Sequence, residues 1–266
     1  MFKRKEVLKP AQHGGLKVLE TNDYSYARGE VLAPIVFDEM ADIAREYPIV
    51  FPDNQTGLPC ALLGLEDGQN AYVDEQGGWQ GIYIPAHIRR YPFMLGKAEQ
   101  AAAAPPRGKD RYIVLFDPDA PQLQDANGHP VFTQSGELTP HVKRRMALLE
   151  SMQKAIPATQ ALVAAIDALG LLVERTIQVN KGGKLTNVVK GLKVVDEKKL
   201  NQLPDADFVS LRNKGALPLV YAHLLSWANF RQGPLAGKYP DLAAKADSKQ
   251  PSFLFESDII SFSGLS

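Results

Sequence analysis

The strongest constraint on the fold is a change in hydrophobic pattern near residue 136. Before this point, short apolar runs alternate with turn residues, a pattern typical of strands. After it, Thr139-Pro140 opens an apolar stripe with helical spacing, since Thr is a good N-cap and Pro suits the first helical position. The sequence therefore predicts an α+β fold, in which an antiparallel β-rich N-terminal half packs with a helical C-terminal half that carries a β-hairpin.

The first half consists of short extended segments joined by turns, with one helix among them. Apolar residues at helical spacing predict this helix between Phe37 and Tyr47. Between residues 60 and 84, the turn pairs Asp67-Gly68 and Gly77-Gly78 separate three apolar segments and predict a three-stranded antiparallel meander. Residues 101–108 are expected to form a linker or exposed loop. Further strands are expected over residues 16–19, 31–35, 49–51, 111–116 and 131–132.

The second half combines helices with one hairpin. The helix that begins after Thr139 is expected to stop or kink at Pro157, and its stripe then resumes towards a C-cap at Gly170. Residues 172–180 and 185–195 flank a Lys-Gly-Gly-Lys turn and predict the hairpin.

Three more helices are expected after the hairpin. Asp196 and Asp205 are placed to cap two short ones. The last runs from about residue 216 to residue 231, and His223 lies off its apolar stripe, either at solvent or beneath another element. Its spacing predicts a core face made of Leu217, Val220, Tyr221, Leu224, Leu225 and Ala228.

We expect one domain over residues 1–266, with a β-rich sub-lobe at 1–135 and a helical sub-lobe at 136–232. The tail, residues 233–266, is expected to be irregular, although Phe253–Phe255 and Ile259-Ile260 could dock on the body. The 30 Lys and Arg balance the 30 Asp and Glu, which argues against nucleic acid as a partner.

The apolar segments bear on location. The most apolar stretch, residues 161–173, is interrupted by Asp167 and Gly170 and is shorter than the roughly 20 residues that cross a bilayer. The basic N-terminus is not followed by an apolar segment, so no cleavable secretory signal is expected. We therefore expect a cytoplasmic protein without a transmembrane segment. Surface association through an uncleaved signal in residues 253–266 stays open.

The cysteine and histidine content predicts neither a metal nor a cofactor. Cys60, the single cysteine, lies in an apolar run and is expected to be an inert core residue. The five histidines are scattered, with none closer than twelve residues to another, and show no ligand spacing. A site assembled from residues distant in the sequence cannot be seen from this spacing.

Acidic residues gather in the loop that follows the expected strand at 111–116. Asp117, Asp119, Asp125 and Glu137 could bind a hard cation or provide a base, but Asp beside Pro and Gly is also ordinary turn composition. Phosphate-loop, dinucleotide-binding and nucleophile-elbow motifs are missing. No catalytic motif is therefore detected, and whether the protein is an enzyme stays open.

The densest unusual stretch is Tyr83–Phe93, hereafter the Tyr83–Phe93 block. Its adjacent arginines, Arg89 and Arg90, could clamp a carboxylate or phosphate, and its tyrosines could stack on a ligand. The structural alternative is one turn of helix between two prolines, with Ile88 and Phe93 in the core and the arginines paired to surface acids. The candidate ligand-binding residues are Tyr83, His87, Arg89, Arg90, Tyr91 and Asp117.

Several segments resemble the SapC family of bacterial proteins over about residues 13–230, and the Tyr83–Phe93 block is the most specific of them. One departure concerns chemistry, because Leu115-Phe116-Asp117 stands where relatives often have Cys-Ile-Asp. The other matching segments are His13–Val18, Tyr24–Arg28, Tyr47–Phe51, Ala61–Leu65, Tyr72–Asp74, Trp79, Gly136-Glu137, Val195–Glu197, Leu200 and Tyr221–Leu224.

The resemblance implies an association with the bacterial surface layer, and brings no established reaction or catalytic residue. Similar proteins tend to be encoded near halogenase-like proteins, cupin-like oxygenases and outer-membrane receptors, which implies a role in processing or importing a compound. A peptide-transporter permease shares the family's name, but this chain lacks the membrane spans of a permease.

Two function classes follow. The first is a binding or accessory protein linked to surface-layer or uptake functions, with an unknown protein or small-molecule partner. The second is an enzyme, or the partner of an enzyme, with a site near Tyr83–Tyr91 and Asp117. A structural surface-layer subunit is the least favoured, since such arrays require export.

Overall fold

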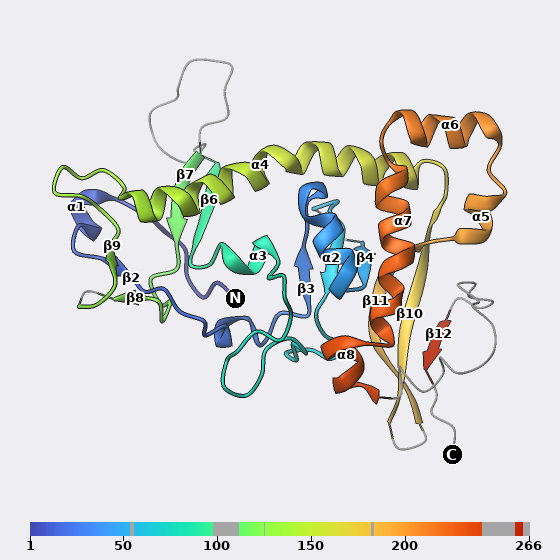
Figure 1. Cartoon of the computed structure of the whole chain (residues 1–266), viewed down its shortest axis with the longest axis horizontal. Coiled ribbons are helices and arrows are strands. Elements are labelled where there is room, and N and C mark those ends of the chain that lie inside the picture. The colour runs from blue at the N-terminus through green and yellow to red at the C-terminus, as the bar shows by residue number, and fades with distance from the viewer. Residues whose placement is uncertain (54–55, 98–111, 125, 182–183, 241–258, 263–266) are drawn as a thin grey trace.

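The computed structural model describes residues 1–53, 56–97, 112–124, 126–181, 184–240 and 259–262. Helix α4 (Pro140–Asp167) runs along most of the molecule's long axis, and most of the sheets and shorter helices lie below it in the view of Figure 1. Antiparallel sheets dominate the first half and helices the second, which confirms the predicted α+β class. The expected linker at 101–108 and the apolar run Phe253–Phe255 lie outside the described residues.

Two small antiparallel sheets form one end of the molecule, around α1 (Pro10–His13). The first has the order β1-β7-β6 and the second the order β8-β2-β9. Together with the first half of α4 they enclose a hydrophobic core that includes Phe93, Phe116 and Met146. The strands are β1 (Glu6–Val7), β2 (Lys17–Val18), β6 (Phe93–Lys97), β7 (Tyr112–Phe116), β8 (Leu123–Gln124) and β9 (His129–Pro130). The strand expected at 131–132 therefore lies two residues earlier.

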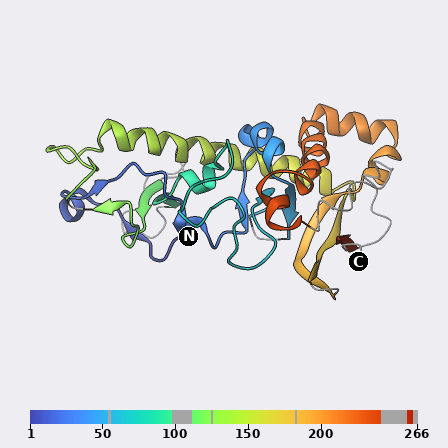
Figure 2. The same ribbon diagram turned by 60° about the horizontal axis from the view of Figure 1, so that its bottom comes forward.

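A six-stranded sheet of order β12-β10-β11-β4-β5-β3 forms the other end. The predicted hairpin is confirmed as β10 and β11, which pair antiparallel and extend from the body in both views (Figures 1 and 2). Among the described strands, only β12 pairs in parallel, on β10. The strands are β3 (Leu32–Pro34), β4 (Ile49–Pro52), β5 (Cys60–Leu62), β10 (Leu172–Lys181), β11 (Lys184–Val195) and β12 (Ile259–Phe262).

The meander predicted between residues 60 and 84 is wrong. Only β5 forms, and it pairs with β3 and β4, while the rest of the segment contains isolated bridges. Side chains satisfy some of the main-chain groups that a strand ladder would pair, while others bond to the main chain, as the Gln80 amide does to the Tyr72 carbonyl. Asn70 accepts from the Tyr72 amide, and Asp74 accepts from the Gln76 and Gly78 amides.

Pro157 does not stop helix α4, which continues from Pro140 to Asp167. Thr159, two residues further on, is buried, donates to the Ala155 carbonyl and accepts from the Phe37 amide. Ala165 and Ile166 are buried in a second hydrophobic core, which lies at the six-stranded sheet. Their burial favours continuation of the helix and offsets the hydrogen bond that a proline removes. Thr139 precedes the helix as predicted, but its hydroxyl donates to the Pro130 carbonyl instead of capping an amide.

The other helices pack against the six-stranded sheet and its loops. Asp196 caps α5 through the Lys199 amide, as predicted, whereas Asp205 is the first residue of α6 and not its cap. The helices are η1 (Ser25–Ala27), η2 (Phe37–Glu39), α2 (Met40–Glu46), α3 (Ala86–Arg89), α5 (Glu197–Asn201), α6 (Asp205–Asn213), α7 (Leu217–Ser226), η4 (Trp227–Phe230) and α8 (Gly233–Lys238).

The core face predicted for α7 is only partly right, since Val220 is buried and Leu217 and Leu224 pack against the core, but the other three positions are exposed. Its fully buried positions include His223 and Ser226, whereas Tyr221 is 46% exposed and Leu225 is 69% exposed. The helix turns this face towards β4, because two of its polar side chains bind the main chain of Ile49. Ser226 accepts from the Ile49 amide and His223 binds the Ile49 carbonyl.

The tail is not irregular throughout. Residues 233–238 form helix α8, whose Leu235 and Ala236 are buried, and Ile259–Phe262 adds a strand to the sheet. Ile259-Ile260, for which docking on the body was left open, thus pairs with β10. Within the described ranges, no helix combines the length and apolar character that a membrane crossing requires.

Candidate functional site

The Tyr83–Phe93 block folds around the single turn of helix α3. Ala86 and Ile88 are buried on the helix, and Phe93 begins β6 with no exposed surface. These positions confirm the helical turn and the core residues of the structural alternative, but Arg89 binds the Ile84 carbonyl and the Tyr83 hydroxyl instead of a surface acid. The outward-facing residues of the block are therefore held by a well-packed element.

Glu39 lies buried beneath the block and was not singled out from the sequence. Its Oε2 atom accepts hydrogen bonds from the Tyr83 hydroxyl at 2.9 Å and from the Ala86 amide at 2.8 Å, and Oε1 accepts from the Val36 amide at 3.2 Å. Burial raises the pKa of Glu39 despite these bonds. The carboxylate thus joins η2 to the start of α3.

The two adjacent arginines lie in different surroundings. Arg89 is exposed, donates from Nε to the Ile84 carbonyl at 2.8 Å and from Nη2 to the Tyr83 hydroxyl at 3.0 Å, and lies over the Tyr83 ring. Arg90 is half-buried with its guanidinium 5.5 Å from the centre of the Phe2 ring, and its shielded Nε has no hydrogen-bond partner among the described residues. Burial lowers the pKa of Arg90. This arrangement does not form the two-arginine clamp.

Tyr91 and Asp117 come together in the interior. The Tyr91 hydroxyl donates to Oδ2 of Asp117 at 3.1 Å, and the Tyr91 ring stacks on Tyr26 with 4.4 Å between centroids. The carboxylate also accepts from the amides of Lys3 at 2.8 Å, Arg4 at 3.3 Å and Asp119 at 3.1 Å. Burial acts to raise the pKa of Asp117, but these four hydrogen bonds outweigh it and hold the pKa below its ordinary value.

The remaining titratable residues of interest are shielded. Burial, aided by the charge of Arg90, lowers the pKa of His87 to about 3, so this side chain is neutral at ordinary pH. Cys60 is buried as predicted, and burial raises the pKa of its thiol to about 12. His223 accepts at Nε2 from the Val195 amide and from Trp227, and burial lowers its pKa to about 4. None of the three is poised for proton transfer near neutral pH.

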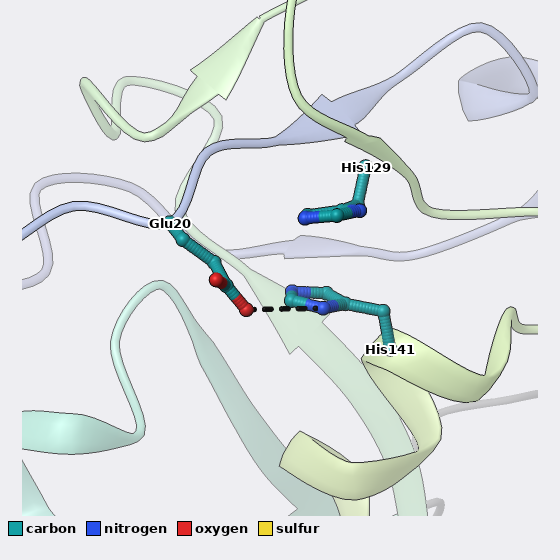
Figure 3. A group of neighbouring side chains, drawn as sticks. All are labelled: Glu20, His129 and His141. Carbon is teal, nitrogen blue, oxygen red and sulfur yellow. Dashed lines mark ion pairs between the residues drawn. The ribbon is translucent and has the colours of Figure 1, made fainter.

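A second group of side chains lies at the end of the molecule near α1. Glu20, His129 and His141 each offer one metal-ligand atom, and the three atoms lie within 4.8 Å of one another (Figure 3). The two imidazole rings stack with centroids 4.3 Å apart, and Nδ1 of His141 lies 3.3 Å from Oε1 of Glu20. Hereafter these three residues are the His–Glu cluster.

Three separate segments build the His–Glu cluster. Val18 of β2 pairs with His129 of β9, which places Glu20, two residues further on, beside this histidine. His141 lies in the first turn of α4. No signal in the sequence spacing predicted this meeting, because it depends on strand register and on the position of α4. Among the acidic loop residues, Asp125 lies outside the described residues and Glu137 pairs with Lys143.

The comparisons with known proteins point to one family. A family model described as SapC matches residues 8–232, which is most of the chain and includes the Tyr83–Phe93 block and the His–Glu cluster. No curated protein and no solved structure matches the chain. On the strength of the family match, this chain belongs to the SapC family.

Proposed function

We propose that this SapC-family protein is a binding or accessory protein that uses Arg89 to hold an acidic group of its partner. The observation that carries the proposal is that Arg89 is exposed yet fixed in place. Two hydrogen bonds and the Tyr83 ring hold its guanidinium, so little side-chain freedom is lost when a partner binds. The donors that these bonds leave unused can bind a carboxylate or phosphate.

The buried Glu39 supports this arrangement. The Tyr83 hydroxyl donates to Glu39 and accepts from Arg89, so a chain of hydrogen bonds links the surface arginine to the interior. An arginine anchored in this way presents its fork in one orientation, which favours a planar acidic group.

The hydrogen bonding favours a binding role over catalysis at the same place. Asp117 receives four hydrogen bonds and has a lowered pKa, which makes it a weak base. His87 is neutral and shielded. The alternative, an enzyme with its site near Tyr83–Tyr91 and Asp117, needs a group able to move a proton, and these two residues do not provide one near neutral pH.

The proposal also includes a biological setting. The family is named for the bacterial surface layer, and we propose that the partner belongs to surface-layer or uptake functions and that the protein acts from the cytoplasm. The partner is a protein or small molecule that carries an acidic group. Nucleic acid is not favoured, because the positive and negative side chains balance.

Native mass spectrometry of the protein purified from its own cells tests the proposal. We expect a bound acidic molecule or protein that is lost from the Arg89→Ala variant and retained by Arg212→Ala, a control at another exposed arginine. Identical spectra for the wild type and Arg89→Ala would contradict the proposal. Turnover of a small molecule by the purified protein alone would favour the enzyme instead.

A further inference from the structure

The His–Glu cluster has the donor atoms of a transition-metal site. Two imidazoles and one carboxylate are a ligand set that binds zinc and other divalent first-row ions. Calcium and magnesium, by contrast, prefer oxygen ligands alone. The chemistry of the cluster therefore points to one class of ion.

A second observation points to a missing partner at the same place. The Nε2 atom of His141 is shielded from solvent and has no hydrogen-bond partner among the described residues. Shielded polar atoms in folded proteins are nearly always partnered. The other nitrogen of the ring, Nδ1, already faces Glu20. Nε2 is therefore the nitrogen of His141 that is left for a metal ion, and the exposed Glu20 side chain can turn from Nδ1 towards an ion bound there.

From these observations we propose that Glu20, His129 and His141 bind one divalent first-row transition-metal ion. Ligand atoms about 2.1 Å from a tetrahedral ion lie about 3.4 Å from each other, and the three atoms here lie within 4.8 Å of one another, so some of the side chains must move to bind an ion. Two of them have room to do so, because His129 is exposed and the Glu20 side chain is 64% exposed. Three protein ligands leave at least one coordination position for water or a small ligand.

The positive charge of Arg145 should weaken cation binding at the cluster, so a substitution of Arg145 can test where the ion binds. This half-buried arginine lies one helical turn after His141, and its charge acts on both His141 and Glu20. A positive charge near the cluster weakens cation binding and competes for the carboxylate. Removing it should strengthen metal binding if the ion lies where we propose.

The first experiment measures zinc binding to the full chain, freed of any tag and treated with chelator, by isothermal titration calorimetry. We expect one Zn²⁺ per chain, and an affinity at least about tenfold lower for His129→Ala and for Glu20→Gln. Glu150→Gln, an exposed acid on the same helix as His141, is the matched control and should bind like the wild type. Absence of saturable binding, or wild-type affinity in His129→Ala, would overturn the proposal.

The second experiment uses Co²⁺, whose visible absorption reports the ligands around it. We expect a cobalt spectrum that changes in His129→Ala, together with an affinity that rises several-fold in Arg145→Gln. Arg144→Gln, an exposed neighbour, should change the affinity less. An affinity that Arg145→Gln leaves unchanged would place the ion elsewhere. The test is independent of Arg89, so its failure leaves the proposed partner binding untouched.

Discussion

The Tyr83–Phe93 block and the His–Glu cluster differ in what their polar side chains bind. In and around the block, carboxylates bind the main chain: Glu39 accepts from two amides and Asp117 from three. In the cluster, the side chains contact one another, and one imidazole nitrogen has no hydrogen-bond partner in the part of the chain that the structure describes. The block was conspicuous in the sequence and the cluster was not.

Polar and charged side chains of the kinds found in active sites can therefore have two roles, to stabilise the fold or to bind a ligand. Irregular segments leave amides that sheets and helices would otherwise satisfy, and buried carboxylates are strong partners for them. Such carboxylates stabilise the fold, and their oxygen atoms are then not available to a ligand. Side chains that lack partners near the surface remain available to a ligand. We therefore expect substitutions at the block to change stability and substitutions at the cluster to change binding.

The largest effect is expected for Asp117→Ala. The change leaves three amides and the Tyr91 hydroxyl without their acceptor in a buried place, and should lower the free energy of unfolding by about 4 kcal/mol. Urea denaturation measures this. Asp119→Ala, at an exposed acid paired with Arg4, should cost less than about 1 kcal/mol. Equal losses in the two variants would contradict the contrast.

The same variant has a defined pH dependence. Because hydrogen bonds hold the pKa of Asp117 below its ordinary value of 3.8, its stabilising effect is present above pH 3.8. It is lost as the pH falls from there through the folded-state pKa. The difference between the wild type and Asp117→Ala should therefore narrow in acid.

A smaller effect is expected for Tyr91→Phe. The ring can still stack on Tyr26, but the hydrogen bond to Asp117 is removed, which should cost about 1.5 kcal/mol. Tyr221→Phe, on the exposed face of α7, is the control and should change the unfolding free energy by less than about 0.5 kcal/mol. A neutral Tyr91→Phe would mean that the amides alone hold Asp117.

Glu39→Gln sharpens the comparison within the block, because its pKa moves in the opposite direction to that of Asp117. Burial raises the pKa of Glu39, so the wild type loses stability as the pH rises above the ordinary value of 4.5. The amide cannot ionise and avoids this loss. We expect the variant to lose about 1 kcal/mol at low pH, because its NH2 group cannot accept from every donor that the carboxyl group satisfies, and to gain on the wild type as the pH rises. The opposite trend would contradict the raised pKa.

The smallest effect on the metal-free protein is expected for His129→Ala. The side chain is exposed, and its loss should change the unfolding free energy by less than about 0.5 kcal/mol. With excess Zn²⁺, the melting temperature should rise for the wild type and stay constant for the variant, since a ligand of the folded state stabilises it. A loss of more than about 1 kcal/mol without metal would mean that the cluster also supports the fold.

Local patterns predicted the elements of the fold that depend on nearby residues. The start of α4 after Thr139, the hairpin of β10 and β11 and the Asp196 cap were all visible, because caps and periods act over a few residues. The orientation of α7 was not, since it depends on how His223 and Ser226 bind Ile49, far away in sequence. The apolar stripe was a poor guide where the buried face is partly polar.

In the candidate sites too, the sequence indicated single residues but not the contacts between residues that are distant in sequence. The sequence indicated Tyr91 and Asp117 because both stand in conspicuous segments, although their contact spans 26 residues. It did not indicate Glu39, whose donors are backbone amides and a tyrosine, and amides leave no mark in a sequence. The His–Glu cluster needs the register of β2 on β9, which short strands do not reveal.

Helix α4 supplies side chains to both hydrophobic cores, Val142 and Met146 to one and Ala165 and Ile166 to the other. The number of residues in α4 therefore sets both the distance between the two cores and the rotation of one set of side chains relative to the other. Inserting or deleting one residue between Leu149 and Thr159 would turn one set of side chains by about 100° relative to the other. The apolar side chains at one end of α4 would then point to solvent instead of into their core. An insertion of four residues nearly restores the angle but separates the cores by about 6 Å, so neither change allows both ends of the molecule to pack.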